Sequence, residues 1–419
     1  MKPVVVLGGG IAGSSVALAL RKRGAAVVVV DAATAASGLP GSATGAAGGM
    51  LTAQYETPDL GPLSTLLAEA RARHPTFAAE VERLSGMCLD RRGGGMLVAN
   101  CDAAQTAGAA ETVRWQRSAG LAAEVVDASR AGLLQTGLPP EAESWLWLPD
   151  EARLDAQKLP VALWVALARS GAELRTGLAA VALDTDGDRV RGVRLADGSR
   201  LKADKVVVAL GVWSAKLEGL PRTLPIRPVR GQMLHVRGSL APRRGPLVAD
   251  HAGRYVIPRA DGSVLLGSTM EEAGFEVLPR DRTADQQLLL EEAGWLWPAC
   301  QEGEVVGHWS GLRPLSPDGL PVLGPDPFLR GLHYAAGYGR SGILLAPLAG
   351  DMVADLVLET KSQPGPDWSP FRIDRFGDPT ALPESKSGTN PRERHRTRSS
   401  QPHPPPETLR TERVSSSSG

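Results

Sequence analysis

Apolar and polar positions in the first thirty residues predict a strand, a helix and a second strand. The valine-rich run at residues 3–7 predicts a buried strand, and residues 11–23 predict a helix that ends in a basic turn followed by Gly24. Residues 26–30 predict the second buried strand. A signal peptide carries its basic residues before its apolar stretch, whereas here they follow it. The pattern therefore predicts a buried strand–turn–helix unit rather than a leader.

Helical and strand patterns are distributed unevenly over the rest of the chain. Residues 34–49 are rich in Gly, Ala, Ser and Thr and predict a loop. Helical periodicity predicts helices at residues 64–84, 103–119, 156–170 and 342–358. Short apolar runs bounded by turn signals predict strands at residues 93–100, 181–184, 190–195, 205–210, 232–236, 255–258 and 264–267. Both ends of the chain are thus predicted to be α/β, with β-rich material between them.

Composition narrows the class of protein. The chain has 419 residues, of which 42% are hydrophobic, so we expect two or three structural units with sizeable cores. Lys+Arg and Asp+Glu each number 46, which favours neither a nucleic-acid binder nor a membrane-surface protein. No stretch has the roughly 20 apolar residues of a membrane span. The distant cysteines Cys88, Cys101 and Cys300 argue against a disulfide scaffold or a CxxC metal site and favour a cytoplasmic protein without a metal.

The C-terminal end of the chain has a different composition. Residues 384–419 contain Leu409 and Val414 as their only aliphatic residues, together with runs of proline and serine. So little apolar surface cannot offset the entropy lost on ordering the chain. We therefore expect a disordered tail over residues 377–419.

A glycine motif joins the first predicted strand to the first predicted helix. Gly8, Gly10 and Gly13 have G-x-G-x-x-G spacing, and Asp31 follows the second strand eighteen residues after Gly13. In such a βαβ unit the first glycine makes a tight turn, the second lets the backbone approach a pyrophosphate, and the third lets helix and strand pack closely. The helix N-terminus faces the phosphates, and the acidic residue binds ribose hydroxyls. The motif fits NAD and FAD alike, but a single N-terminal copy followed by long mixed structure favours FAD.

Further segments, together with this motif, resemble one family. They are AAGGML at 46–51, ADKVVVALGVWS at 203–214, PIRPVRGQML at 225–234, YVIPRADGSVLLGSTMEEAGFE at 255–276, WSGLRPLSPDGLPVLG at 309–324, AAGYGRSGILLAP at 335–347 and FRIDRF at 371–376. In this order, over residues 1–376, they resemble the D-amino-acid oxidase superfamily of FAD-dependent amine oxidases. Within it, the similarity is greatest to the glycine oxidases of thiamine biosynthesis.

The resemblance implies an α/β fold with mixed α+β character, built from two domains. A Rossmann-like FAD-binding domain would comprise residues 1–60, 155–225 and 315–376. A discontinuous mixed-sheet substrate domain would comprise residues 61–154 and 226–314 and would lie over the flavin. This division agrees with the order of the predicted elements.

The resemblance also implies a set of FAD-binding residues. The segment at 47–50 would run past the isoalloxazine ring, and backbone N–H groups at the start of the last helix would face the electron-rich edge of the flavin. Sarcosine oxidases tether their flavin through a cysteine near the final arginine motif, and since no cysteine lies there, we expect non-covalent FAD. The full set is Gly8, Gly10, Ile11, Ala12, Gly13, Asp31, Ala47, Gly48, Gly49, Met50, Ala180, Gly211, Trp213, Gly339, Ser341, Gly342, Ile343 and Leu344.

Three residues are candidates for contact with a substrate. A planar guanidinium binds a carboxylate through two parallel hydrogen bonds, and Arg313 follows an apolar strand, where it can point into a cavity. The resemblance makes Arg313 the carboxylate clamp, gives the Tyr255 hydroxyl a second hydrogen bond to the carboxylate, and places Arg340 near substrate and flavin. Glu56 matches an acid beside the pocket, but it fits a solvated loop equally well.

Some positions depart from the family pattern. Gly339 stands where glycine oxidases carry a bulky aromatic residue, and Gly253 stands where they often carry histidine. Asp31 replaces the commoner glutamate at the ribose position, a mild change. Gly339 would leave open volume over the pocket, so a strict preference for glycine does not follow. His251 and His308 are not assigned to the site, because the expected chemistry needs no strong base.

The implied reaction is the oxidative deamination of glycine or a small amino acid or amine. The α-carbon hydrogen would leave as hydride to flavin N5, molecular oxygen would be reduced to hydrogen peroxide, and the imine would hydrolyse to a 2-oxo acid and ammonia, feeding thiamine thiazole synthesis. The alternatives are a D-amino-acid dehydrogenase or sarcosine-type enzyme with another acceptor, a non-catalytic FAD-holding subunit, and an NAD dehydrogenase. The exact amine and the oligomeric state, a homo-oligomer included, stay open.

Overall fold

The computed structural model describes residues 2–238, 245–278, 281–360 and 366–377. The tail expected at residues 377–419 lies outside these ranges apart from Gly377. Within the described residues, no helix combines the length and the apolar character needed to cross a membrane.

A six-stranded sheet is built around the first predicted strand. The valine-rich strands at its centre pair in parallel, and only its edge pair, β18 with β19, is antiparallel. Its order is β18 (Val322–Pro325), β19 (Leu332–Ala336), β12 (Val206–Val208), β1 (Val4–Leu7), β2 (Val27–Asp31) and β8 (Glu173–Thr176). Parallel strands that are buried on both faces need continuous apolar sequence, which the runs of valine supply.

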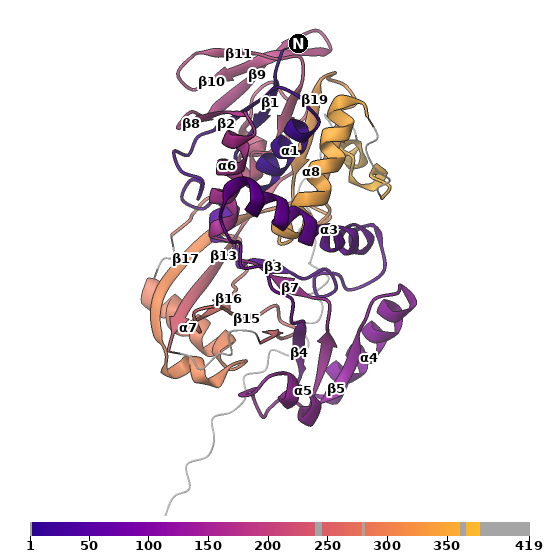
Figure 1. Cartoon of the computed structure of the whole chain (residues 1–419), viewed down its shortest axis with the longest axis vertical. Coiled ribbons are helices and arrows are strands. Elements are labelled where there is room, and N and C mark those ends of the chain that lie inside the picture. The colour runs from indigo at the N-terminus through magenta and orange to yellow at the C-terminus, as the bar shows by residue number, and fades with distance from the viewer. Residues whose placement is uncertain (1, 239–244, 279–280, 361–365, 378–419) are drawn as a thin grey trace, which may run out of the picture. The chain divides into compact units, whose positions relative to one another are not determined.

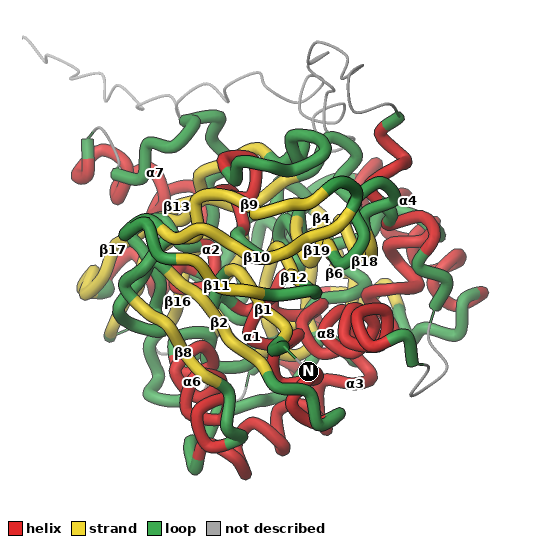
Figure 2. Tube along the Cα trace, turned by 90° about the horizontal axis from the view of Figure 1, so that it is seen from above, coloured by secondary structure: helices red, strands yellow, loops and turns green. Residues whose placement is uncertain are grey.

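Both faces of this sheet are covered. Alternate residues of β1 point to opposite sides: Val4 and Val6 pack against helices, whereas Val5 and Leu7 pack against a second, three-stranded sheet. The helices are α1 (Ile11–Lys22), α3 (Pro62–Ser85), α6 (Lys158–Arg169) and α8 (Gly342–Leu358), seen in the upper half of Figure 1. The small sheet has the order β11 (Arg200–Lys202), β10 (Arg189–Leu195) and β9 (Ala180–Asp186), and it lies across β1 and β2 in Figure 2.

An eight-stranded mixed sheet forms the other half of the fold. Its order is β17 (Glu304–Leu315), β13 (Arg227–Arg237), β16 (Val264–Gly267), β15 (Tyr255–Pro258), β14 (Leu247–Ala249), β4 (Met96–Asn100), β6 (Ser144–Leu148) and β5 (Glu124–Asp127). Helices α5 (Ala128–Leu134) and α7 (Arg282–Gly294) share one apolar cluster with it, and α4 (Ala103–Ser118) shares a cluster with its other face. Strands β3 (Met50–Leu51) and β7 (Ala152–Arg153) form a two-stranded sheet beside α3 (Figure 1).

The predicted elements agree with the structure where the pattern is strongly periodic. Strands β15 and β16 and helix α8 have the predicted bounds, and α1, α3, α4 and α6 agree within two residues. The predicted loop at 34–49 contains a short helix, α2 (Ala43–Ala46), and the predicted strand at 205–210 is only three residues long. The fold class is confirmed as mixed α/β. The two large sheets draw their strands from the segments expected for the two domains, but α3 packs on α6 and α8, and the domain division stays a prediction.

Candidate functional site

A cavity of about 500 Å³ runs from the glycine turn after β1 to strands β13, β15 and β17. This volume lies within the range of about 300–1,000 Å³ that is common for ligand sites. Arg313, Tyr255 and Arg340 all line it. So does every residue of the expected FAD-binding set except Gly13. The structure therefore brings together segments from Gly8 to Leu344, which are 336 positions apart in the chain.

Gly13 has a packing role next to the cavity. A Cβ atom built at Gly13 would lie 1.9 Å from the carbonyl oxygen of Gly8, so helix α1 can approach the turn this closely only with glycine there. Gly8 itself has φ +102°, a backbone conformation that side chains disfavour. Asp31 accepts hydrogen bonds from the backbone N–H groups of Gly9 at 2.5 Å and Ala33 at 2.7 Å. The turn is thus fixed from both sides before any ligand binds.

Two residues that contact the same turn were not found from the sequence. The Thr44 hydroxyl accepts a hydrogen bond from the N–H of Ile11 at 3.0 Å, and the indole of Trp164 donates to the carbonyl of Gly9 at 2.7 Å. Both residues line the cavity. Thr44 lies in the small-residue segment 34–49 and Trp164 on the cavity side of α6, and neither position carries a motif that distinguishes it.

The N-terminus of α8 also opens onto the cavity. Its first residues, Gly342, Ile343 and Leu344, line the cavity, and Ser341 makes no side-chain capping bond. The first N–H groups of a helix have no intrahelical acceptor, and the helix dipole favours negative charge beside them. Behind this turn, Nε2 of the fully buried His74 donates to the carbonyl of Ile343 at 2.9 Å.

We expect His74 to make the protein sensitive to acid. Burial lowers the pKa of His74 from 6.5 to about 4, so the unfolded chain binds a proton first as the pH falls. Its stabilising contribution is complete above pH 6.5 and is lost as the pH falls through about 4, a change on the order of 3 kcal/mol. Urea unfolding at pH 7.5 and 4.5 should show a smaller pH effect for His74→Gln, whose amide can still donate to Ile343. Equal pH effects in the two proteins would contradict this expectation.

Arg313 lies on β17 and is held from one side by a loop. Its guanidinium donates to the carbonyl of Thr269 at 3.0 Å and to the hydroxyl of Ser268 at 2.8 Å. It lies directly against Gly231 of the neighbouring strand, where a Cβ atom would come within 2.1 Å of Nη1. Burial lowers the pKa of Arg313 from its ordinary value, but guanidinium pKa values are so high that the group stays charged at neutral pH.

The side chain of Tyr255, on β15, likewise lies against a glycine of the neighbouring strand, β16. It pairs in register with Gly267, where a Cβ atom would be 2.7 Å from the tyrosine ring. Its hydroxyl is 3.9 Å from the sulfur of Met233, which also lines the cavity. Two strand glycines, Gly231 and Gly267, therefore make room for the two polar side chains on the cavity face of the sheet.

Arg340 forms an ion pair with Glu56. Their Nε and Oε2 atoms are 3.1 Å apart, and both side chains are largely buried, with 19% and 9% of their surface exposed. Burial lowers the pKa of Arg340, but the charge of Glu56, the hydrogen bond to it and the neighbouring Tyr55 and Tyr255 together outweigh burial and hold that pKa above its ordinary value. Of the two interpretations of Glu56 left open by the sequence, the structure supports the acid beside the pocket, since Glu56 lines the cavity.

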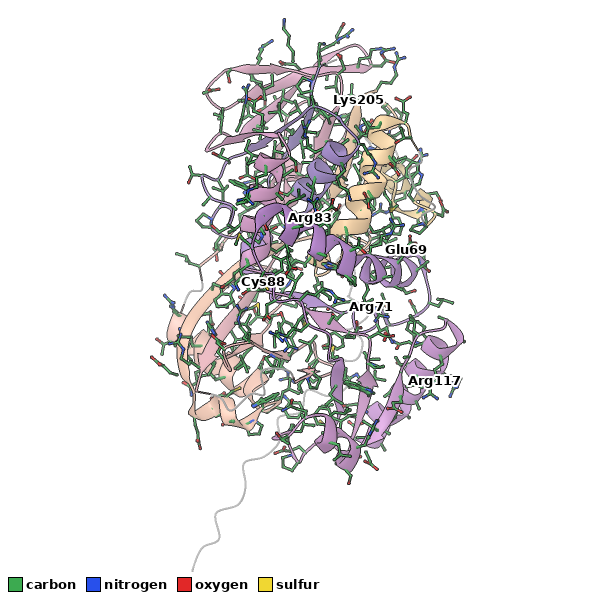
Figure 3. The ribbon with its side chains drawn as sticks, viewed as in Figure 1. Glu69, Arg71, Arg83, Cys88, Arg117 and Lys205 are labelled. Carbon is green, nitrogen blue, oxygen red and sulfur yellow. The ribbon has the colours of Figure 1, made fainter. Side chains whose placement is uncertain are left out.

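The loop that carries Glu56 is anchored by a buried carboxylate. Glu151 is completely buried and accepts hydrogen bonds from the backbone N–H groups of Ala53, Gln54 and Tyr55 at 3.0, 2.6 and 3.0 Å. Arg71, labelled on α3 in Figure 3, donates to the same carboxylate at 3.1 Å. Burial raises the pKa of Glu151, and Arg71 and the backbone donors oppose that effect. No sequence motif indicated this anchor.

The histidines and cysteines set aside by the sequence analysis do not line the cavity. His251 bonds to Asn100 at 2.7 Å and His308 to Gln232 at 2.8 Å. Cys88, labelled in Figure 3, is exposed, and Cys300 is buried in the core of the eight-stranded sheet. Among the described residues, no group of three or more His, Cys, Asp or Glu side chains is arranged to hold a metal ion.

Comparisons with known proteins agree with this geometry. The chain is 32% identical to the bifunctional protein ThiO/ThiG of Trichormus variabilis over 366 residues, which are 87% of this chain and 54% of that protein. It is 31% identical to the glycine oxidase of Geobacillus kaustophilus, over 89% of this chain and 96% of that enzyme. The crystal structure of a glycine oxidase from that organism superposes with a TM-score of 0.82 at 30% identity, covering 89% of this chain and 98% of that one. The chain thus spans about half the length of the first relative and nearly all of the other two.

The family comparison identifies the cofactor. The family described as DAO, FAD dependent oxidoreductase, matches residues 3–356, a range that includes every residue lining the cavity. Of the two nucleotides that the glycine motif fits, FAD is therefore confirmed, and none of the lining residues is a cysteine that could tether it. With a matching fold, a dinucleotide turn and a match over most of its length, the chain belongs to the family of FAD-dependent oxidoreductases.

Proposed function

We propose that this protein oxidises glycine or another small amino acid or amine, giving an imine that hydrolyses to a 2-oxo acid and ammonia. FAD, when bound, would supply the redox chemistry of this reaction, in which the α-hydrogen is removed as hydride and molecular oxygen is reduced to hydrogen peroxide. The chain has to bind the substrate, orient its α-carbon and keep water out.

One observation carries the proposal: a partly buried guanidinium, that of Arg313, lines the cavity together with a tyrosine. A guanidinium has five N–H donors, and the bonds to Ser268 and to the carbonyls of Thr269 and Arg230 use three of them, so further donors remain for a substrate carboxylate. Tyr255 offers a hydroxyl on the same face of the sheet. Together they would fix the carboxylate and thereby the direction of the Cα–H bond.

The opposite part of the cavity fits FAD. The glycine turn, the N-terminus of α1 and Thr44 would hold the pyrophosphate, and the free lone pairs of the Asp31 carboxylate would accept ribose hydroxyls. The N-terminus of α8 would face the pyrimidine edge of the ring system. A cradle made largely of glycine and alanine backbone leaves space for a large planar ligand.

The proposal is tested with the purified protein. Its visible spectrum should show bound flavin, and glycine or another small amino acid should bleach it under anaerobic conditions. Admitting oxygen should restore the colour and give one hydrogen peroxide per flavin reduced. Bleaching without peroxide formation would favour a dehydrogenase with another acceptor. A flavin that no amine bleaches would contradict the proposal and favour a non-catalytic subunit.

We propose further that the product serves thiamine thiazole synthesis. The support is the pairing in one relative, whose printed name joins ThiO to ThiG, with a similarity that covers 87% of this chain. Deleting the gene that encodes this chain should then create a growth requirement for the thiazole part of thiamine. Growth without that supplement would contradict this assignment.

We expect Gly231→Ala to disable the carboxylate clamp although Arg313 itself is not substituted. The added methyl group would overlap Nη1 and force the guanidinium to move, because the clash distance of 2.1 Å leaves no room. The specificity constant for the best amino acid should fall at least tenfold, with the flavin spectrum unchanged. Gly108→Ala is the matched control, since a Cβ atom there meets nothing within 4 Å. In a double-mutant cycle, adding Gly231→Ala to Arg313→Ala should cost nothing more, and an additive loss would contradict the proposed contact.

A further inference from the structure

The charged groups around the cavity fall into two sets. Six charged residues line it: Asp31, Glu56, Lys216, Glu218, Arg313 and Arg340. Asp31 binds the glycine turn, Lys216 lies over the ring of Phe275, and Glu218 pairs with Arg194. The remaining three are Arg313, Arg340 and Glu56, and the charges of the last two act on the pKa of Arg313, so they share one neighbourhood.

These three residues carry two positive charges and one negative charge. Arg340 forms an ion pair with Glu56 at 3.1 Å. Arg313, in contrast, donates hydrogen bonds to neutral groups, namely two backbone carbonyls and a serine hydroxyl. Arg313 therefore remains the cation that lacks a counter-ion in this set. A buried cation is stabilised by one anion, and a second anion would have to compete with Glu56 for Arg340.

We propose that Glu56 determines specificity: by neutralising Arg340 it restricts the site to substrates with a single carboxylate. This inference rests on the proposed function and adds the substrate class. Without the carboxylate of Glu56, Arg340 becomes a second free guanidinium beside Arg313, and the site then suits an amino acid that carries two carboxylates. The open space at Gly339, where a Cβ atom would meet only Leu315 at 4.0 Å, gives the second carboxylate room next to Arg340.

The test compares two anions and two substrates in the flavin-bound protein. Acetate and malonate are bound anaerobically, and their dissociation constants are read from the perturbation of the flavin absorption spectrum. N-ethylglycine and iminodiacetate are compared by their specificity constants. N-ethylglycine carries a methyl group where iminodiacetate carries its second carboxylate. The variants are Glu56→Gln, which removes the charge, and Glu56→Asp, which keeps it and serves as the control.

For Glu56→Gln we expect the malonate-to-acetate preference and the iminodiacetate-to-N-ethylglycine preference each to rise at least tenfold over the parent. In Glu56→Asp, which keeps the charge, these two preference ratios should stay close to those of the parent. Arg340→Gln provides a second, independent test. In this variant Glu56 has lost its partner and neutralises the charge of Arg313 instead, so acetate should bind at least tenfold more weakly than in the parent. Should Glu56→Gln fail to retain flavin, the Arg340→Gln measurement decides.

Two kinds of failure are distinguishable. Ratios within twofold of the parent in Glu56→Gln, or unchanged acetate binding in Arg340→Gln, would overturn the role of Glu56. If no amino acid is turned over even by the parent, the proposed function fails, but the acetate and malonate titrations still report on the charge balance of the site.

Discussion

Arg313→Ala should lose amino-acid oxidation almost completely while keeping its flavin. The guanidinium is partly buried and lines the cavity, and a bound substrate would cover it further. Removing one partner of a buried charge pair costs about 3–5 kcal/mol, because the other charge is left unpaired. At roughly 1.4 kcal/mol per factor of ten, the specificity constant should fall by two to three decades or more. FAD should remain bound, since its proposed contacts come from other residues. The measurements are the visible spectrum and steady-state kinetics on the best amino acid.

Two comparisons make this result specific to a carboxylate. An amine without a carboxylate has no charge to leave unpaired, so Arg313→Ala should oxidise it with a much smaller loss. Arg313→Lys should be intermediate, because an ammonium cannot make two parallel hydrogen bonds. If Arg313→Ala oxidised its best amino acid within a few-fold of the parent, the clamp would lie elsewhere, with Arg340 the next candidate.

Gly13→Ala should destabilise the fold and abolish FAD binding together. The new Cβ atom would lie 1.9 Å from the Gly8 carbonyl oxygen, a backbone atom that cannot turn away, so α1 has to separate from the turn. Overpacking of this kind costs about 3 kcal/mol. Thermal unfolding of the FAD-free proteins and the flavin content after purification measure the two effects.

Gly10→Val should affect FAD binding without affecting the stability of the FAD-free fold. Gly10 has φ −68° and ψ −176°, which valine can adopt, and a Cβ atom there meets only the Thr44 hydroxyl, at 3.2 Å. Its methyl groups would instead occupy the space expected for the pyrophosphate. This variant should lose FAD, yet unfold at the temperature of the FAD-free parent, which is the proper reference because bound ligand raises stability. Full yellow colour in Gly10→Val would contradict the assignment of the pyrophosphate site.

The local parts of the site were predictable because one short segment contains all of their determinants. The βαβ unit from β1 to β2 needs only a valine run, three glycines and an acid at a fixed spacing, and each can be recognised from neighbouring residues. The same holds for α8, whose start follows from the apolar run that begins at Gly342. Arg313 and Tyr255 were found through a resemblance, since nothing in their local pattern sets them apart from a surface arginine or a core tyrosine.

The supporting residues could not be predicted, because their partners are distant in the chain. Glu151 anchors backbone nearly one hundred residues away, and Trp164 binds Gly9 across 155 positions. Gly231 looks like any glycine in a strand until the register places Arg313 against it. Strands β5, β6 and β14 escaped prediction for a related reason: they are short, and their stability comes from pairing within the eight-stranded sheet.

The strand order also determines when the cofactor site can form during synthesis. The glycine turn follows β1, but β1 lies between β2 and β12, and the cavity is completed by the first turn of α8, at residues 342–344. A nascent chain therefore exposes its nucleotide-binding turn more than 300 residues before the opposite wall of the site has been made. Sheets assembled from such distant segments fold slowly and leave strand edges unpaired in the meantime. Capture of FAD thus belongs to the last stage of maturation, and a shortage of flavin leaves the complete chain, rather than the growing one, without its ligand.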